Sequence, residues 1–160
     1  MNPTPISRDE VMERELYFIA APDFAALPES FSFPSQHFVA LLVADTTQVA
    51  AETLGSFSRA LLSSGCSFFC AWGPGCERAH DLFDEECLFA SAVIMTTWHD
   101  DEPLDEAIWY FLRTTFPHDA YWHGTHSALA IVVGDPHWAS HVERRLRDIP
   151  SLADDVLQEV

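Results

Sequence analysis

The sequence predicts one α/β domain in three layers, with a mostly parallel central sheet of the flavodoxin-like or Rossmann-like kind. Three observations lead to this prediction. The chain has 160 residues, a length that suits one domain with a continuous core. Its 48% hydrophobic content is typical of a globular protein. Four apolar runs are each followed by a segment with helical spacing, and strand–helix units in series form the right-handed crossovers of a parallel sheet.

Residues 1–37 precede this regular part and are expected to hold a helix, an edge strand and a proline-rich loop. Ser7 and Glu10 have the spacing of a capping box, which predicts a short helix from there to about residue 13. Residues 15–20 (ELYFIA) are rich in aromatic and branched side chains and predict a strand at one edge of the sheet. Residues 21–36 contain three prolines and are expected to cross the surface as a loop.

Residues 38–147 are expected to form the repeated strand–helix core. The predicted strands are 38–44, 66–71, 92–96 and 128–133, which are continuous apolar runs as found in strands buried on both faces. Helices are expected after Asp45 and Thr46, from about Cys76, over 103–116 and over 136–147. Residues 148–160 should add a last helix, with Ser151 as its cap after Pro150.

The formal charge of −17 restricts the partners that the protein can have. Nucleic acid and anionic membrane surfaces would be repelled, so neither is expected to bind. A basic protein partner is expected, and a small-molecule ligand remains possible. All eight basic residues are arginine, so Schiff-base chemistry on lysine is excluded.

The composition also favours a cytoplasmic location. The first residues, MNPTPISRDE, lack the basic and apolar regions of a secretory signal. The longest apolar runs are too short to span a bilayer. Four cysteines in such a chain are expected to be reduced thiols.

The loops that follow the predicted strands should meet at one edge of the sheet, where ligands bind in folds of this kind. Tryptophans there could stack on a flat ring or anchor a partner. The aspartates stand where helices begin, so helix capping is the favoured explanation for them, and a site for a hard cation such as Mg²⁺ is the alternative. The residues expected at this ligand or partner edge are Asp45, Trp72, Glu77, Trp98, Asp101, Asp135, His137 and Trp138.

The cysteines of residues 66–87 divide into expected core positions and one candidate nucleophile. Cys66 and Cys70 share a strand face with Phe68, and Cys87 continues a helical stripe through residues 76, 79 and 83. Cys76 follows a Gly-Pro-Gly turn at a helix start, where the helix dipole lowers the pKa of a thiol.

Two pairs of residues are candidates for catalysis. His80 lies one helical turn after Cys76 and could take its proton. His99 with Asp100 is the second candidate acid–base pair. The cysteine spacing does not suit structural zinc, and the strand ending at residue 44 is not followed by a Gly-rich phosphate loop, so no metal or cofactor is expected. Metal binding by the histidine-rich residues 116–126 stays open.

A motif in this region resembles small bacterial proteins that are grouped as a domain of unknown function. It reads W-G-x-x-C-E-x-x-H-D and begins at Trp72, and residues 98–112 (WHDDEPLDEAIWYFL) are similar to a second segment of those proteins. The resemblance covers roughly residues 38–145. It implies a bacterial cytosolic α/β protein and brings no activity with it.

Two functions of different class fit these observations. The first is an acidic binding protein that neutralises or regulates a basic protein partner, as immunity-type or defence-type proteins do. The alternative is a small hydrolase or transferase that acts on a nucleotide or another small molecule at the strand edge. A concave pocket favours the enzyme, and a broad acidic face favours the binding protein. The acidic face should join two groups of side chains: Glu77, Asp81, Asp84 and Glu85, and Asp100, Asp101, Glu102, Asp105 and Glu106.

Overall fold

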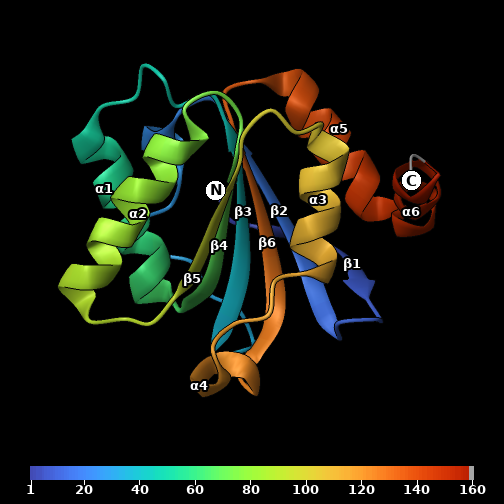
Figure 1. The fold of residues 1–160 in the computed structure, drawn as a ribbon, viewed down its shortest axis with the longest axis horizontal. Helices are drawn as coiled ribbons and strands as arrows, with labels where there is room; N and C mark the ends of the chain where they lie inside the picture. Colours follow the sequence, from blue (N-terminus) through green and yellow to red (C-terminus); the bar gives the residue numbers. More distant parts are fainter. Residues whose placement is uncertain (159–160) are drawn as a thin grey trace.

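A six-stranded sheet runs through the middle of the molecule, with helices on both of its faces (Figure 1). The computed structural model describes residues 1–158. The spatial order is β1-β2-β6-β3-β4-β5, in which β1 is antiparallel to β2 and the other neighbours are parallel. The strands are β1 (Thr4–Asp9), β2 (Arg14–Ala21), β3 (His37–Ala44), β4 (Cys66–Trp72), β5 (Met95–His99) and β6 (Thr125–Val133). The predicted α/β class with a mostly parallel sheet is therefore confirmed.

The helices divide between the two faces of the sheet. One face carries α1 (Ala51–Ser64) and α2 (Cys76–Ala90), and the other carries α3 (Leu104–Arg113) and α5 (Pro136–Arg147), with α6 (Ile149–Leu157) packed outside these two. The short α4 (Asp119–Trp122) lies beyond the end of the sheet at which β6 begins, and a single 3-10 turn occupies Phe24–Ala26. Within residues 1–158, no helix has the length and apolar character needed to cross a membrane.

The central strand β3 shows why its sequence is a continuous apolar run. Phe38, Ala40 and Leu42 point toward α1 and α2, whereas Val39 and Leu41 point toward α3 and α5. All of these side chains are buried. A strand covered by helices on both faces has no solvent side that would accept polar residues, as predicted for the parallel core.

Cys66 and Cys70 do not share one face of β4 as expected, because the strand contains a bulge between them. Cys66 pairs with Phe38, but the next residue of β3, Val39, pairs with Phe68. The extra residue, Ser67, reverses the alternation of the strand. Cys66 therefore belongs to the α1–α2 side of the core, and Phe68 and Cys70 to the opposite side, instead of sharing one face.

The N-terminal segment differs most from expectation. The helix predicted from Ser7 is absent from the described chain, because residues 4–9 form β1. The Ser7 hydroxyl donates to the Leu146 carbonyl oxygen at 2.7 Å, so it does not cap a helix. β2 confirms the predicted strand, but it is not at the edge of the sheet, since β1 covers it on one side and β6 on the other.

Several boundaries also move, each for a local reason. α1 begins at Ala51 rather than after Thr46, because the Thr46 backbone N–H donates to the Pro74 carbonyl oxygen at 2.9 Å and ties its loop to the β4–α2 turn. β5 begins at Met95 rather than at residue 92, because Ser91 is left-handed and caps α2. α3 ends at Arg113, before residue 116, and the cap of α6 is Asp148, whose carboxylate accepts from the predicted cap, Ser151.

Candidate functional site

The loops after β4 and β5 diverge, because β4 leads to α2 on one face and β5 leads to α3 on the other. Loops that diverge at the carboxyl ends of parallel strands leave a hollow between them, and ligands bind outside these ends in open α/β sheets. A pocket of about 450 Å³ lies there, and we call it the edge pocket. Its lining residues are Trp72, Gly73, Pro74, His99, Asp100, Asp101, Glu102 and Trp138.

Two tryptophans form a fixed wall of the edge pocket. The Trp72 indole N–H donates to the Glu102 carbonyl oxygen at 2.8 Å, which joins the β4 end to the β5–α3 loop. Trp138 meets Trp72 edge to face, with 5.1 Å between ring centroids. Trp138 lies in the first turn of α5, which Asp135 caps by accepting from the backbone N–H groups of residues 137 and 138. The predicted N-cap role of Asp135 is confirmed.

The turn between β4 and α2 requires glycine at two positions. Gly73 has φ +116° and Gly75 has φ +80°. A Cβ atom on Gly73 would overlap the Ala44 carbonyl oxygen, and one on Gly75 would lie 2.7 Å from Thr46 Oγ1. Glycine thus lets the turn lie directly on the end of β3, which shapes the pocket.

His99 lines the pocket from a buried position and is held by two hydrogen bonds. Its Nδ1 lies 3.0 Å from a carboxylate oxygen of Glu102, and its Nε2 lies 2.9 Å from Thr97 Oγ1. The ring also packs on Tyr110, at 4.7 Å between centroids, and burial raises the pKa of Tyr110. The predicted pair of His99 with Asp100 is thus replaced by a pair with Glu102. Glu102 orients the imidazole, while Asp100 is exposed at the rim.

Cys76 does not show the expected features of a nucleophile. Its side chain is buried, and burial raises the pKa of the thiol instead of the helix dipole lowering it. The His80 ring is engaged elsewhere, with Nδ1 2.9 Å from Asp81 and Nε2 2.9 Å from the Thr96 hydroxyl. Cys76 lies at the start of α2 as predicted. The predicted proton acceptor, His80, bonds to Asp81 and Thr96 instead.

Trp98 does not join the other tryptophans. Its neighbour across the sheet is Ala71, which faces α1 and α2, whereas Trp72 pairs with His99 on the α3 side. Trp98 packs on His80 instead, at 4.6 Å between ring centroids. The predicted meeting of three tryptophans at one site is thus wrong for this residue, because alternation along β5 turns it to the opposite face.

The remaining predicted residues lie around the pocket rather than in it. Asp45 accepts from the Thr47 backbone N–H and hydroxyl at 3.0 and 2.6 Å, and these bonds lower the pKa of Asp45. This is a local turn rather than the cap of α1. His137 is exposed in the first turn of α5. Glu77 lines an adjacent hollow of about 390 Å³ together with Cys76, Arg78, Asp81 and Asp100.

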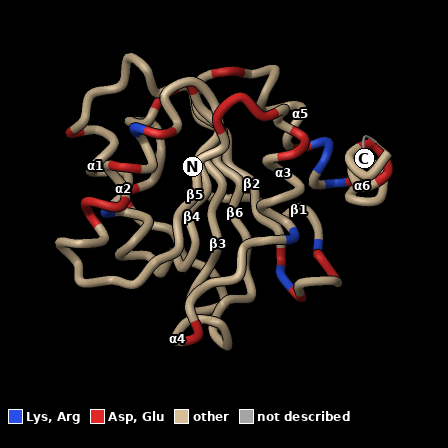
Figure 2. Tube along the Cα trace, in the orientation of Figure 1, with Lys and Arg blue, Asp and Glu red and all other residues tan. Residues whose placement is uncertain are grey.

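The edge pocket is strongly acidic. Asp100, Asp101 and Glu102 line it, and within residues 1–158 none of them pairs with an arginine. The nearby Arg78 donates instead to the carbonyl oxygens of Thr46 and Val49, at 2.9 and 2.6 Å. Figure 2 shows acidic residues along the loops above the strand ends and a group of arginines in α5.

The two predicted acidic groups meet at Asp100, which lines both the edge pocket and the adjacent hollow. Asp105 is an exception within the second group. It accepts from Arg145 at 2.9 Å and lies 2.6 Å from His141. Burial alone would raise the pKa of Asp105, but these hydrogen bonds and charges lower it overall. Sequence reasoning missed this pairing and the role of Glu102, since neither follows from spacing along the chain.

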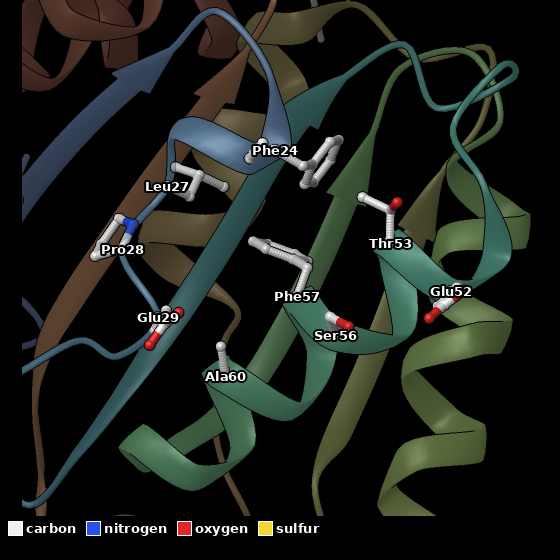
Figure 3. A pocket seen from close by; sticks show the side chains of 10 residues that line it. Phe24, Leu27, Pro28, Glu29, Glu52, Thr53, Ser56, Phe57 and Ala60 are labelled. Atoms are coloured by element: carbon white, nitrogen blue, oxygen red, sulfur yellow. The ribbon is translucent and has the colours of Figure 1, made fainter.

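Three other hollows contain none of the predicted site residues, and the smallest of them, of about 300 Å³, is lined by Arg144, Arg145, Asp148, Ser151 and Asp155. Another, of about 430 Å³, lies between the 3-10 turn and α1 and is lined by Phe24, Leu27 and Phe57 among others (Figure 3). The third, of about 530 Å³, lies near the start of β4 and includes His37, Phe89 and Tyr121. Over the described chain, no three His, Cys, Asp or Glu side chains are placed so that they could hold a metal ion.

Comparison with known proteins places the chain in a family without assigning an activity. A family model described as "Domain of unknown function (DUF7684)" matches residues 16–149. The chain therefore belongs to this family. No curated protein and no solved structure shows a significant match.

Proposed function

We propose that the protein is an acidic binding protein that neutralises or regulates a basic protein partner, and that the edge pocket receives a lysine or arginine side chain of that partner. The observation that carries this proposal is the position of Asp100, Asp101 and Glu102 beside Trp72 and Trp138 around one pocket. Glu102 is held by His99, but the carboxylates of Asp100 and Asp101 have no basic partner within residues 1–158 and can attract a cation, and an indole ring adds a favourable cation–π contact.

The charge of the whole chain supports the same partner class. The arginines are held by their own chain; Arg59 bonds Glu86, Arg113 bonds Asp9, and Arg145 bonds Asp105. The excess negative charge is left to act outward, which accelerates encounters with basic proteins and opposes nucleic acid and anionic membranes. A tryptophan fixed at a pocket wall is a common anchor in protein interfaces.

The setting that we propose is the cytoplasm of a bacterium, in an immunity-type or defence-type role. Four buried cysteines, all free thiols, suit a reducing compartment. The motif from Trp72 to Asp81 supports the bacterial assignment. We also propose that the fold is of the flavodoxin-like or Rossmann-like kind. The position of the edge pocket at the carboxyl ends of the strands supports this.

A small hydrolase or transferase is the second candidate, and one observation favours it. His99 lines a concave pocket and is oriented by Glu102, as an acid–base residue would be. The acidic lining opposes nucleotide phosphates, because Arg78 is engaged with backbone oxygens and no arginine lines the edge pocket. The alternative therefore fits an uncharged or cationic small molecule better than a nucleotide.

The proposal is tested with two variants of equal charge and a short oligoarginine peptide as the probe. One variant carries Asp100→Asn and Asp101→Asn in the edge pocket. The other carries Asp119→Asn and Asp154→Asn, which are exposed in α4 and α6. Calorimetric titration should give about 2- to 30-fold weaker binding for the pocket variant than for the control, since each exposed charge pair contributes about 0.2–1 kcal/mol. Equal losses in the two variants would reject a specific cation site. Esterase or transferase activity of the parent protein that is lost on substitution of His99 would favour the second candidate.

A further inference from the structure

The outer edge of β5 combines an unpaired strand with several exposed apolar side chains on and near it. In the described chain β5 pairs with β4 alone. Leu88 and Phe89 at the end of α2 are 81% and 77% exposed, and Val93, Met95 and Trp98 are also exposed. Isolated exposed apolar residues are ordinary, but exposed apolar residues such as Met95 and Trp98 on an open strand edge mark a surface for another chain.

The two edges of the sheet differ in how they meet solvent. On the other edge, β1 carries Pro5 and Arg8, and Arg8 forms ion pairs with Glu10 and Glu15. Charges and prolines of this kind prevent an edge strand from pairing with other chains. β5 (MTTWH) has neither lysine, arginine nor proline. Its edge therefore lacks the usual protection.

The side chains around β5 differ between its two faces. Thr96 and Trp98 lie on the α2 side, where Thr96 donates to Asp84 at 2.6 Å. Asp81 and Glu85 on the same helix are exposed, and Leu88 follows one turn after Asp84. On the opposite face Met95 and Thr97 pair with Phe68 and Cys70, so that side of the edge is apolar.

From this arrangement we infer that an extended segment of the basic partner adds to the sheet as a strand beside β5. This inference rests on the proposed function and names the part of the partner that makes contact. The segment alternates: its arginine or lysine residues lie over Trp98 and the acidic side of α2, and its apolar residues extend the face of Met95. Backbone hydrogen bonds supply affinity in this mode and alternate side chains supply specificity.

A second copy of the chain is a poorer occupant of the same edge. A two-fold antiparallel pairing of β5 strands would bring α2 beside its own copy, with Asp84 and Glu85 opposed to the same residues. Like charges in that position repel, and each copy already carries a net charge of −17. Charge complementarity therefore selects a basic partner.

The probe is a synthetic peptide of alternating valine and arginine, and its control is a copy of equal charge in which every backbone nitrogen is methylated. The peptide should bind and protect backbone amides of Thr96, Thr97 or Trp98 from hydrogen exchange, and the methylated copy should bind at least about tenfold more weakly. Leu88→Ser should weaken peptide binding, whereas Val11→Ser, at an exposed position in the β1–β2 turn near the other edge of the sheet, should not.

The outcomes separate this inference from the proposed function. Equal binding of both peptides without protection of β5 overturns strand addition and leaves the proposed cation site standing. Absence of binding by either peptide, together with equal losses in the charge variants above, rejects the proposed function itself. A dimer of the free protein in which the β5 amides are already protected overturns the choice of occupant.

Discussion

Replacing Gly73 by alanine should destabilise the protein, because the turn that shapes the edge pocket has no room for a side chain. Gly73 has φ +116°, a backbone conformation that costs a residue with a Cβ atom about 1–2 kcal/mol. The new atom would also overlap the Ala44 carbonyl oxygen, and relief of such overpacking costs about 1–3 kcal/mol more. The sum, roughly 2–5 kcal/mol, is a large part of the stability of an ordinary domain.

Thermal unfolding followed by circular dichroism measures this effect. For a chain of this size the predicted cost lowers Tm by roughly 4–20 °C. Gly55→Ala is the matched control. Gly55 lies inside α1, where a Cβ atom would be 3.4 Å from Arg59 and Glu86, and alanine is the better helix former by about 1 kcal/mol. If Gly73→Ala melts at the temperature of the parent protein, the turn can accommodate a Cβ atom and does not require glycine there.

Three further predictions concern the thiols, an ion pair and the core. Burial raises the pKa of Cys87 to about 11, so its thiolate fraction at pH 8 is roughly 100-fold lower than that of an ordinary thiol. Burial also raises the pKa of Cys76, so brief alkylation followed by mass-spectrometric mapping should leave both thiols largely unmodified in the native state. Rapid labelling of Cys76 would support the hypothesis of a catalytic thiol. Asp105→Asn should lower the free energy of unfolding by roughly 1–2 kcal/mol at pH 7, because it removes the charged hydrogen bonds to Arg145. Since the folded-state pKa of Asp105 is lowered, this difference in stability should shrink as pH falls below about 4. A difference in Tm that stays constant with pH would contradict this prediction. Ile131→Asp should abolish cooperative unfolding, because a buried unpaired carboxylate costs several kcal/mol, and a normal melting curve would show that β6 is not a core strand.

The parts of the fold that the sequence predicted are those in which one physical requirement dominates. Strands covered on both faces must be apolar throughout, which identified β3, β4 and β6. Helices α2 and α5 begin at turn and capping residues, and Asp135 followed by Pro136 located the start of α5.

The errors arose where pairing between distant segments outweighs a local signal. Ser7 and Glu10 have the spacing of a helix cap, but β1 gains backbone hydrogen bonds along β2 that a short helix would not replace. The single extra residue at Ser67 places Cys66 on the α1–α2 side of the sheet, and no glycine, proline or other turn residue in the sequence marks this bulge. Such features depend on strand register, which local periodicity does not determine.

The candidate site was predicted in position but not in its contacts. The carboxyl edge of the sheet, Trp72, Trp138 and the acidic loop were all anticipated from strand order. The partner of His99 was not, because Asp101 adopts φ +55° and the turn brings Glu102 rather than Asp100 back to the ring. Trp98 was assigned to the wrong face, because its direction depends on the register of β5.

Mapping where a cationic probe binds on the protein shows whether the edge pocket receives a cationic side chain of a partner. The measurement is a titration of the isotopically labelled protein with the oligoarginine peptide, followed by the NMR signals of backbone amides and tryptophan indoles. We expect the indole N–H groups of Trp72 and Trp138 and the amides of Asp100 and Asp101 to shift first. Asp100→Asn with Asp101→Asn should remove these shifts. Shifts that spread evenly over the acidic surface, or that first appear away from the carboxyl edge of the sheet, would contradict binding in the edge pocket.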